Sequence, residues 1–270
     1  MSIEAFIFDV DGTLADTEEA HRVAFNNAFE RYRLGWCWTP EAYRELLHTT
    51  GGKERIAAYL ATKTLSTSDR RRLTELIPAI HAEKTRFYSS FVADGAIPLR
   101  PGVRRLIEET LAAGCRLAIA STTTAANVDA LLRSNFGEQG LAMFSVIACG
   151  DQVRAKKPAP DIYRLALQHL GLQPEQAVAF EDSRNGLRAA TEAGLWTVIT
   201  PTFWTEDHDF DGAALVLPHL GEPGQPLDGE PGGKLRDAAW LTFDEVARRA
   251  DQRPRSGIDA VYAGTAGVHG

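Results

Sequence analysis

Short apolar runs alternate with segments of helical periodicity along most of this chain, and this alternation limits its possible folds more than any other feature. Runs of strand length lie at residues 5–8, 117–120, 144–148, 177–180 and 196–199. Helix-period segments lie between several of them, such as 103–111 behind Pro101 and 162–170 ahead of Gly171. Strand and helix in alternation predict a doubly wound, parallel, Rossmann-like α/β sheet.

The alternation stops once, between residues 17 and 92, where helical periods dominate and no strand candidate occurs. We therefore expect an all-helical cap domain inserted after the first strand. Residues 1–16 and 93–250 would form the core domain, with a Gly- and Pro-containing connection over 93–101. A compact insertion on two short linkers is placed to act as a lid. The Gly- and Ala-rich tail, 251–270, is expected to be disordered.

Charge and cysteine content exclude several classes of protein. A net charge of −7 disfavours a broad surface for nucleic acid or anionic membranes, because both are polyanionic. No apolar run approaches the roughly 20 residues of a membrane span, and no signal sequence is evident. Three widely spaced cysteines suit neither a disulfide framework nor a zinc site. We expect a cytoplasmic monomer that acts on a small molecule, without nucleic-acid or membrane partners.

Acidic residues follow two of the predicted strands. Asp9 and Asp11 come after the first strand, and Glu181 and Asp182 come after the fourth. The carboxyl ends of parallel strands meet at one edge of a sheet, so these side chains should converge. Two carboxylates about 4 Å apart repel by about 4 kcal/mol at an effective dielectric constant near 20. A bound cation would relieve this repulsion, and an all-oxygen set of ligands suits Mg²⁺.

Phosphoryl transfer fits this combination of residues. Asp9 would be both nucleophile and metal ligand, and Asp11 would protonate the leaving oxygen and later activate the hydrolytic water. Ser121, Thr122 and Lys157 follow two other strands and would hold the phosphoryl group. A calcium loop is the poorer interpretation of DVDG, because the sixth and twelfth loop positions would be Leu and Ala instead of Gly and Glu.

These residues resemble the four motifs of the haloacid dehalogenase superfamily, which occur here in the family's order. The insertion after DVDGTLADTEEAH resembles the cap of the phosphoglucomutase-like subgroup. Within that subgroup, TTGGKER, KKPAPDIY, EDSRNGLRAA and TPTFWTEDHDF are similar to CbbY-type phosphatases. The resemblance implies hydrolysis of xylulose 1,5-bisphosphate, an inhibitor of Rubisco, through an aspartyl phosphate. Thr123 and Thr124 stand where relatives often carry Ser-Asn.

The cap supplies the predicted contacts to the non-reacting part of the substrate. The loop that contains Lys53 and Arg55 is basic in an acidic chain, so it could hold a second phosphate. Glu18 and His21 lie one turn apart, close in sequence to the nucleophile loop, and Arg44 is a further cap candidate.

Three other functions stay open at this point. A phosphomutase of the β-phosphoglucomutase kind would use the same nucleophile but return the phosphoryl group to a sugar. A catalytically idle member would bind a metabolite or protein through its cap as a regulator. Dehalogenation suits the acid pair and the metal carboxylates less well than phosphoryl transfer does.

Overall fold

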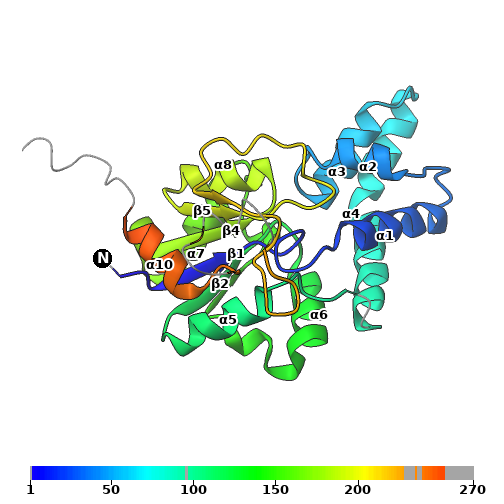
Figure 1. The fold of residues 1–270 in the computed structure, drawn as a ribbon. Coiled ribbons are helices and arrows are strands. Elements are labelled where there is room, and N and C mark those ends of the chain that lie inside the picture. Colours follow the sequence, from blue (N-terminus) through cyan, green and yellow to red (C-terminus); the bar gives the residue numbers. More distant parts are fainter. Residues whose placement is uncertain (1, 95–96, 228–234, 236–238, 253–270) are drawn as a thin grey trace, which may run out of the picture.

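A computed structural model describes residues 2–94, 97–227, 235 and 239–252 of the chain. The predicted disordered tail lies outside these residues, except for Asp251 and Gln252 at its start. Figure 1 shows a sheet wrapped by helices, with a separate group of helices, α1 to α4, to one side of it. In the described part of the chain, no helix combines the length and the apolar character needed to cross a bilayer.

The sheet has six parallel strands in the order β3-β2-β1-β4-β5-β6. The strands are β1 (Ala5–Phe8), β2 (Arg116–Ala120), β3 (Val146–Ala148), β4 (Ala177–Glu181), β5 (Trp196–Ile199) and β6 (Leu215–Val216). This confirms the predicted parallel α/β core. The third strand is shorter than predicted, because Leu141–Met143 form a 3₁₀ turn that runs up to Phe144, and β6 was not predicted.

Helices cover both faces of the sheet, because alternate side chains of each strand point to opposite faces. One face carries Phe6 and Phe8 of β1 and packs against α5 (Val103–Ala112), α6 (Ala125–Phe136) and α10 (Phe243–Asp251). The other face carries Ala5 and Ile7 and packs against α7 (Asp161–Leu170) and α8 (Arg184–Glu192). Further 3₁₀ turns lie at Gly137–Gln139, Gly150–Gln152 and Pro174–Gln176.

Four helices follow β1 before the chain enters the rest of the core: α1 (Glu18–Arg31), α2 (Pro40–Leu46), α3 (Gly52–Ala61) and α4 (Thr67–Ala93). They have their own apolar centre, which includes Phe25, Phe29, Trp38 and Tyr43. The long helix α4 packs against α1 and α3 within this group and against α6 of the core. The predicted all-helical insertion is thus observed, while the exact limits of the domains stay a prediction.

Candidate active site

The order of strands brings the two acidic motifs together. β1 and β4 are direct neighbours, and the backbone N–H of Asp9 donates to the carbonyl of Phe180 at 3.0 Å. Asp9 therefore lies beside Glu181 and Asp182, and all three side chains are buried. One carboxylate oxygen from each lies within 4.8 Å of the other two, which suits a shared metal ion.

Lys157 is the cation at the centre of this cluster. Its buried Nζ donates to Oδ1 of Asp9 and to Oε1 of Glu181, both at 2.6 Å. The hydroxyl of Tyr163 donates to the same oxygen of Glu181 at 2.6 Å. Glu181 thus anchors Lys157, and Lys157 fixes one oxygen of Asp9.

The cluster has more negative charge than its own residues can neutralise, since it contains three carboxylates and one ammonium group, which pairs with Asp9 and Glu181. Burial raises the pKa of Asp9 to about 7, with Lys157 opposing the shift and the charges of Glu181 and Asp11 adding to it. Burial and the neighbouring Glu181 and Asp9 also raise the pKa of Asp182 well above its ordinary value. Divalent cation binding would relieve both penalties, so these residues fit Mg²⁺.

The turn that follows β1 approaches Asp182 too closely for any side chain. Gly12 has φ 82°, a left-handed conformation, and a Cβ there would collide with the Asp182 carboxylate. The guanidinium of Arg100 donates to the carbonyls of Gly12, Thr200 and Pro201 and so ties this turn to the loop after β5. The close approach of Asp182 to the nucleophile turn is therefore built into the backbone.

Asp11 lies two residues after Asp9 but faces the cap. Its Oδ1 accepts hydrogen bonds from Thr17 Oγ1 at 2.6 Å and from His21 Nε2 at 2.8 Å. Lys84 of α4 contacts the other ring nitrogen of His21, with its Nζ 2.7 Å from His21 Nδ1. Although burial opposes it, the charge and hydrogen bond of His21, the Thr17 hydroxyl and the charge of Lys84 hold the pKa of Asp11 well below its usual value. The Asp11 carboxylate is not among the oxygens that lie together around the candidate metal position, and its role as a metal ligand stays a prediction.

The predicted phosphate-binding residues lie at the ends of β2 and β3. Ser121 and Thr122 line the pocket together with Lys157, and Ser121 is buried. The backbone N–H of Thr123 donates to Ser121 Oγ at 3.4 Å, and Asn127 Nδ2 donates to Thr123 Oγ1 at 2.8 Å. These contacts hold the loop at the start of α6 against the pocket.

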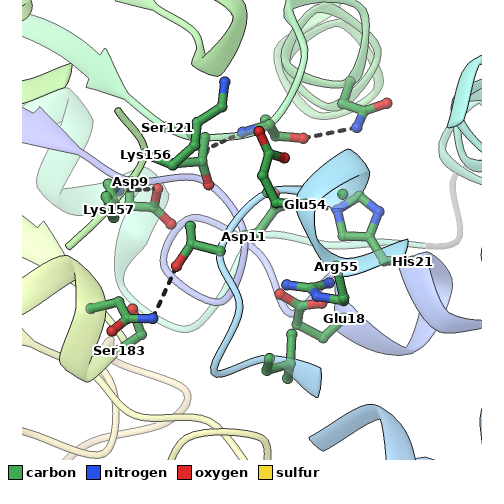
Figure 2. Close-up of a pocket in the computed structure, with 18 of the residues that line it drawn as sticks. Asp9, Asp11, Glu18, His21, Glu54, Arg55, Ser121, Lys156, Lys157 and Ser183 are labelled. Atoms are coloured by element: carbon green, nitrogen blue, oxygen red, sulfur yellow. Dashed lines mark hydrogen bonds and ion pairs between the residues drawn. The ribbon is translucent and has the colours of Figure 1, made fainter. Parts of the chain in front are cut away.

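The cap provides the opposite wall of the pocket. Figure 2 shows Asp9 and Lys157 on one side and Glu18, His21 and Arg55 on the other. Arg55 Nη1 donates to the hydroxyl of Tyr43 at 2.8 Å, and that hydroxyl donates to Glu18 Oε2 at 2.7 Å. The cap therefore holds a cation and an anion in a fixed arrangement that faces the acidic cluster.

Two of the other predicted cap residues reach the core. Lys53 lines the pocket, and its Nζ forms an ion pair with Asp151 Oδ1 at 3.0 Å. Arg44 is not among the residues that line the pocket, and its contact with substrate stays a prediction. Its guanidinium lies 2.9 Å from Asp207 and 3.6 Å from Glu206, so it joins the cap to the loop after β5.

Sequence reasoning did not identify several residues that the structure places at the site: Thr17, Tyr43, Lys84, Arg100, Asn127, Tyr163 and Thr205. One signal was available for Lys84. It lies on the same face of α4 as the buried Ile77, Ile80 and Tyr88, and a lysine in such a stripe needs a buried partner. The contacts of Tyr43 and Arg100 are long-range and have no comparable signal in the sequence.

Comparisons with known proteins agree with this geometry. Residues 3–194 match the model of the haloacid dehalogenase-like hydrolases. Protein CbbY from Cereibacter sphaeroides is 52% identical over 222 residues, which are 82% of this chain and 94% of that protein. The plasmid CbbY of Cupriavidus necator is 49% identical over 225 residues, 83% of this chain and 89% of that protein.

A solved structure shows the same similarity. It is a variant of CbbY from Rhodobacter sphaeroides in complex with xylulose-(1,5)bisphosphate, 50% identical, with a TM-score of 0.76 over 82% of this chain and 96% of that one. These matches confirm the predicted superfamily, the similarity to CbbY-type proteins and the prediction that the chain is an enzyme. The chain belongs to the haloacid dehalogenase-like hydrolases.

Proposed function

We propose that this protein is a magnesium-dependent phosphatase that removes a phosphoryl group from xylulose 1,5-bisphosphate through an aspartyl phosphate on Asp9. One observation carries the proposal. A buried cluster of three carboxylates with one ammonium group, that of Lys157, faces a cap wall that contains Lys53 and Arg55 across one pocket. The cluster suits a metal and one phosphate, while the cap can hold a second anionic group.

Mg²⁺ would be held by Asp9 and Asp182, with Glu181 close by. When bound, it would supply positive charge that stabilises these carboxylates and the phosphoryl oxygens. Glu181 is the less direct partner, because its Oε1 already accepts from Lys157 and Tyr163.

Asp9 would act as the nucleophile. Among the described residues, the hydrogen bond from Lys157 reaches Oδ1 of Asp9, which leaves Oδ2 to attack phosphorus. A bond forms between Asp9 Oδ2 and phosphorus while the bond from phosphorus to the sugar oxygen breaks. Ser121 and Lys157 would hold the phosphoryl oxygens during this step. Water then attacks the aspartyl phosphate, releases inorganic phosphate and restores the Asp9 carboxylate.

Asp11 would serve as acid in the first step and base in the second. With Thr17 and His21 as donors, its carboxylate is held in the anionic form, which suits the base role. To protonate the leaving oxygen it must first carry a proton, so substrate binding has to change its partners. His21 connects it to Lys84 of the cap, which makes this change sensitive to the position of the cap.

The choice of a bisphosphate rests on the cap and on the relative described above. The CbbY variant in complex with xylulose-(1,5)bisphosphate is 50% identical to this chain, and the match covers 82% of this chain. Arg55 is buried and already fixed by the Tyr43 hydroxyl, so a second phosphate would meet a preorganised cation.

A panel assay tests the proposal. Phosphate release is measured with Mg²⁺ from xylulose 1,5-bisphosphate, from ribulose 1,5-bisphosphate, from sugar monophosphates and from an aryl phosphate, each with a chelator control. We expect the highest kcat/KM for xylulose 1,5-bisphosphate and no release with chelator. Conversion of a sugar phosphate to its isomer without release of phosphate would instead indicate a phosphomutase.

The remaining parts of the proposal concern the setting of the enzyme. We propose that residues 17–92 close over the core as a cap, with the core formed by 1–16 and 93–250. We also propose that the enzyme acts as a monomer in the cytoplasm, where the free thiols of Cys37, Cys115 and Cys149 would be stable. Size-exclusion chromatography with light scattering would test the oligomeric state.

A further inference from the structure

The loop after β5 extends from the core to the cap. Trp204 on this loop is 5% exposed and packs among cap residues, although the chain segment around it belongs to the core. Its ring meets the ring of Tyr43 edge-on, with centroids 5.7 Å apart and planes at 88°. Trp204 is thus a core side chain that completes the apolar centre of the cap.

Tyr43 connects this contact to the substrate pocket. It is fully buried, its hydroxyl donates to Glu18 and accepts from Arg55, and the Arg55 guanidinium lies 5.1 Å from its ring centre. Trp38 packs on the same ring from within the cap, with centroids 5.9 Å apart. The orientation of the Tyr43 hydroxyl, and with it the pair of Glu18 and Arg55, therefore depends on rings from both domains.

The loop that carries Trp204 is fixed to the catalytic side of the pocket. Thr205 Oγ1 accepts from the Thr202 N–H at 3.0 Å, and the Trp204 N–H donates to Thr202 Oγ1 at 3.2 Å, which closes a tight turn. Thr205 also donates to Asp182 Oδ2 at 3.3 Å. The position of Trp204 is therefore linked through two residues to the carboxylate cluster.

We propose that Trp204 is a positioning residue: by packing on Tyr43 when the cap is closed, it sets Glu18 and Arg55 in the arrangement that reads the non-reacting part of the substrate. This inference rests on the proposed function for the identity of the substrate. Cap opening separates Trp204 from Tyr43, removes one side of the packing around the ring and loosens Glu18 and Arg55. Glu18 and Arg55 are thus fully ordered only in the closed enzyme, where the cap lies against the carboxylate cluster.

The matched control is the ion pair that joins the same loop to the same helix. Asp207→Asn weakens the contact with Arg44 at 2.9 Å but leaves Tyr43 and Trp204 in place. If Trp204 acts merely by holding the cap closed, Asp207→Asn and Trp204→Ala should change the same kinetic constants. If Trp204 acts through Tyr43, only Trp204→Ala should raise KM for the bisphosphate.

The experiment compares Trp204→Ala, Trp204→Phe, Tyr43→Phe, the double variant Tyr43→Phe/Trp204→Ala and Asp207→Asn on xylulose 1,5-bisphosphate and on p-nitrophenyl phosphate. We expect Trp204→Ala to raise KM for the bisphosphate about 10-fold, with partial recovery in Trp204→Phe and little change for the aryl ester. In the Tyr43→Phe background, the effect of Trp204→Ala should shrink to about 2-fold. Equal losses on both substrates, or the same effect with and without the Tyr43 hydroxyl, would overturn the inference.

A second measurement needs no substrate. Hydrogen exchange of the peptides over residues 43–56 should become faster in Trp204→Ala and stay unchanged in Asp207→Asn. If the wild-type enzyme fails to hydrolyse the bisphosphate while this exchange pattern holds, the proposed function fails and the coupling of Trp204 to Tyr43 stands. Unchanged exchange in a folded Trp204→Ala protein, checked by circular dichroism, would refute the coupling.

Discussion

Asp9 and Asp11 are separated by one residue, yet their surroundings shift their pKa values in opposite directions. Burial raises the pKa of Asp9 to about 7; the charges of Glu181 and Asp11 add to this shift, and Lys157, which Asp9 shares with Glu181, opposes it. Asp11 has the Thr17 hydroxyl and His21 as its own donors, and its pKa is lowered despite burial. The number of donors per carboxylate, more than burial itself, decides which of the two is short of positive charge.

This contrast assigns the two residues different tasks. The cluster around Asp9 is short of positive charge, which supports the proposed metal and phosphate at this position. Asp11 is satisfied by protein groups that come partly from the cap, so its state can follow the cap. The predictions below test whether this division is correct.

The largest effect is expected for Asp9→Asn, which should reduce turnover of every phosphate ester to background. The amide is neither the required nucleophile nor an anionic ligand. Phosphate release from the bisphosphate and from an aryl phosphate measures the loss, and circular dichroism checks the fold. Retained turnover on either ester would remove Asp9 from the reaction.

Asp11→Asn should lower kcat/KM, which reports the first step, by about 10²–10⁴-fold for sugar phosphates and by much less for p-nitrophenyl phosphate, whose leaving oxygen needs no proton. The ratio of the two losses measures the acid role separately from the nucleophile. The Asp9→Asn variant is the control, since its losses should not depend on the leaving group. Equal losses for both esters in Asp11→Asn would argue against proton donation.

Sequence reasoning predicted the strand tips well because local signals determine them. Apolar runs locate β1, β2, β4 and β5, and the carboxyl ends of parallel strands meet at one edge of the sheet. The strand order, which the sequence analysis did not predict, makes Asp9 the direct neighbour of Glu181 and Asp182. The edge strand β6 was not predicted, because a strand of two residues has hardly any periodic signal in the sequence. Ser121 and Lys157 were also predicted as site residues, because they follow two other strands and match motifs of the superfamily.

The cap was harder to predict because its contacts join residues far apart in sequence. His21 meets Lys84 across 63 positions, and nothing local to either residue indicates the pairing. Arg44 was expected to face the substrate, but the acidic pair Glu206 and Asp207 attracts its guanidinium to the loop after β5. The direction of the Asp11 side chain likewise depends on cap donors that sequence motifs do not describe.

A third prediction concerns the stability of the metal-free protein, where Asp9→Asn and Asp11→Asn should have opposite signs. The folded pKa of Asp9 lies above its unfolded value of 3.8, so the folded state binds this proton more tightly and its stability falls as pH rises from about 4 to 7. Asp9→Asn removes that penalty and should raise the free energy of unfolding, more at pH 8 than at pH 5. Asp11 has a lowered pKa, so it stabilises the fold above pH 4, and Asp11→Asn should cost about 1–3 kcal/mol.

Urea unfolding with chelator at pH 5 and pH 8 measures these differences. Mg²⁺ should stabilise the wild type at pH 8 and stabilise Asp9→Asn much less, because the variant has lost a ligand. Destabilisation by both variants at pH 8 without metal would contradict the proposed excess of negative charge around Asp9.

The smallest effect is expected for substitution of Lys53, the exposed basic residue of the cap. Its comparison with the buried Arg55 distinguishes a preorganised phosphate contact from an exposed ion pair. Arg55 is 8% exposed and held by Tyr43, so Arg55→Ala should raise KM for the bisphosphate at least 10-fold and leave the aryl ester nearly unchanged. Lys53 is 44% exposed in its side chain and paired with Asp151, and exposed pairs contribute about 0–1 kcal/mol. Lys53→Ala should therefore raise KM about 2- to 5-fold, less at high salt.

The comparison with Asp151→Asn decides what Lys53 does. If Lys53 serves mainly to hold the cap against the core, Asp151→Asn should raise KM by the same factor as Lys53→Ala, since either change removes the ion pair. Alternatively, Lys53 breaks its ion pair with Asp151 and then binds the second phosphate. In that case Asp151→Asn should lower KM, because no ion pair has to break before Lys53 binds substrate. We expect the second result, since Lys53 lines the pocket and its side chain is open to solvent. Matching increases of KM in both variants would make Lys53 a residue of cap closure and leave Arg55 as the cap's reader of the bisphosphate.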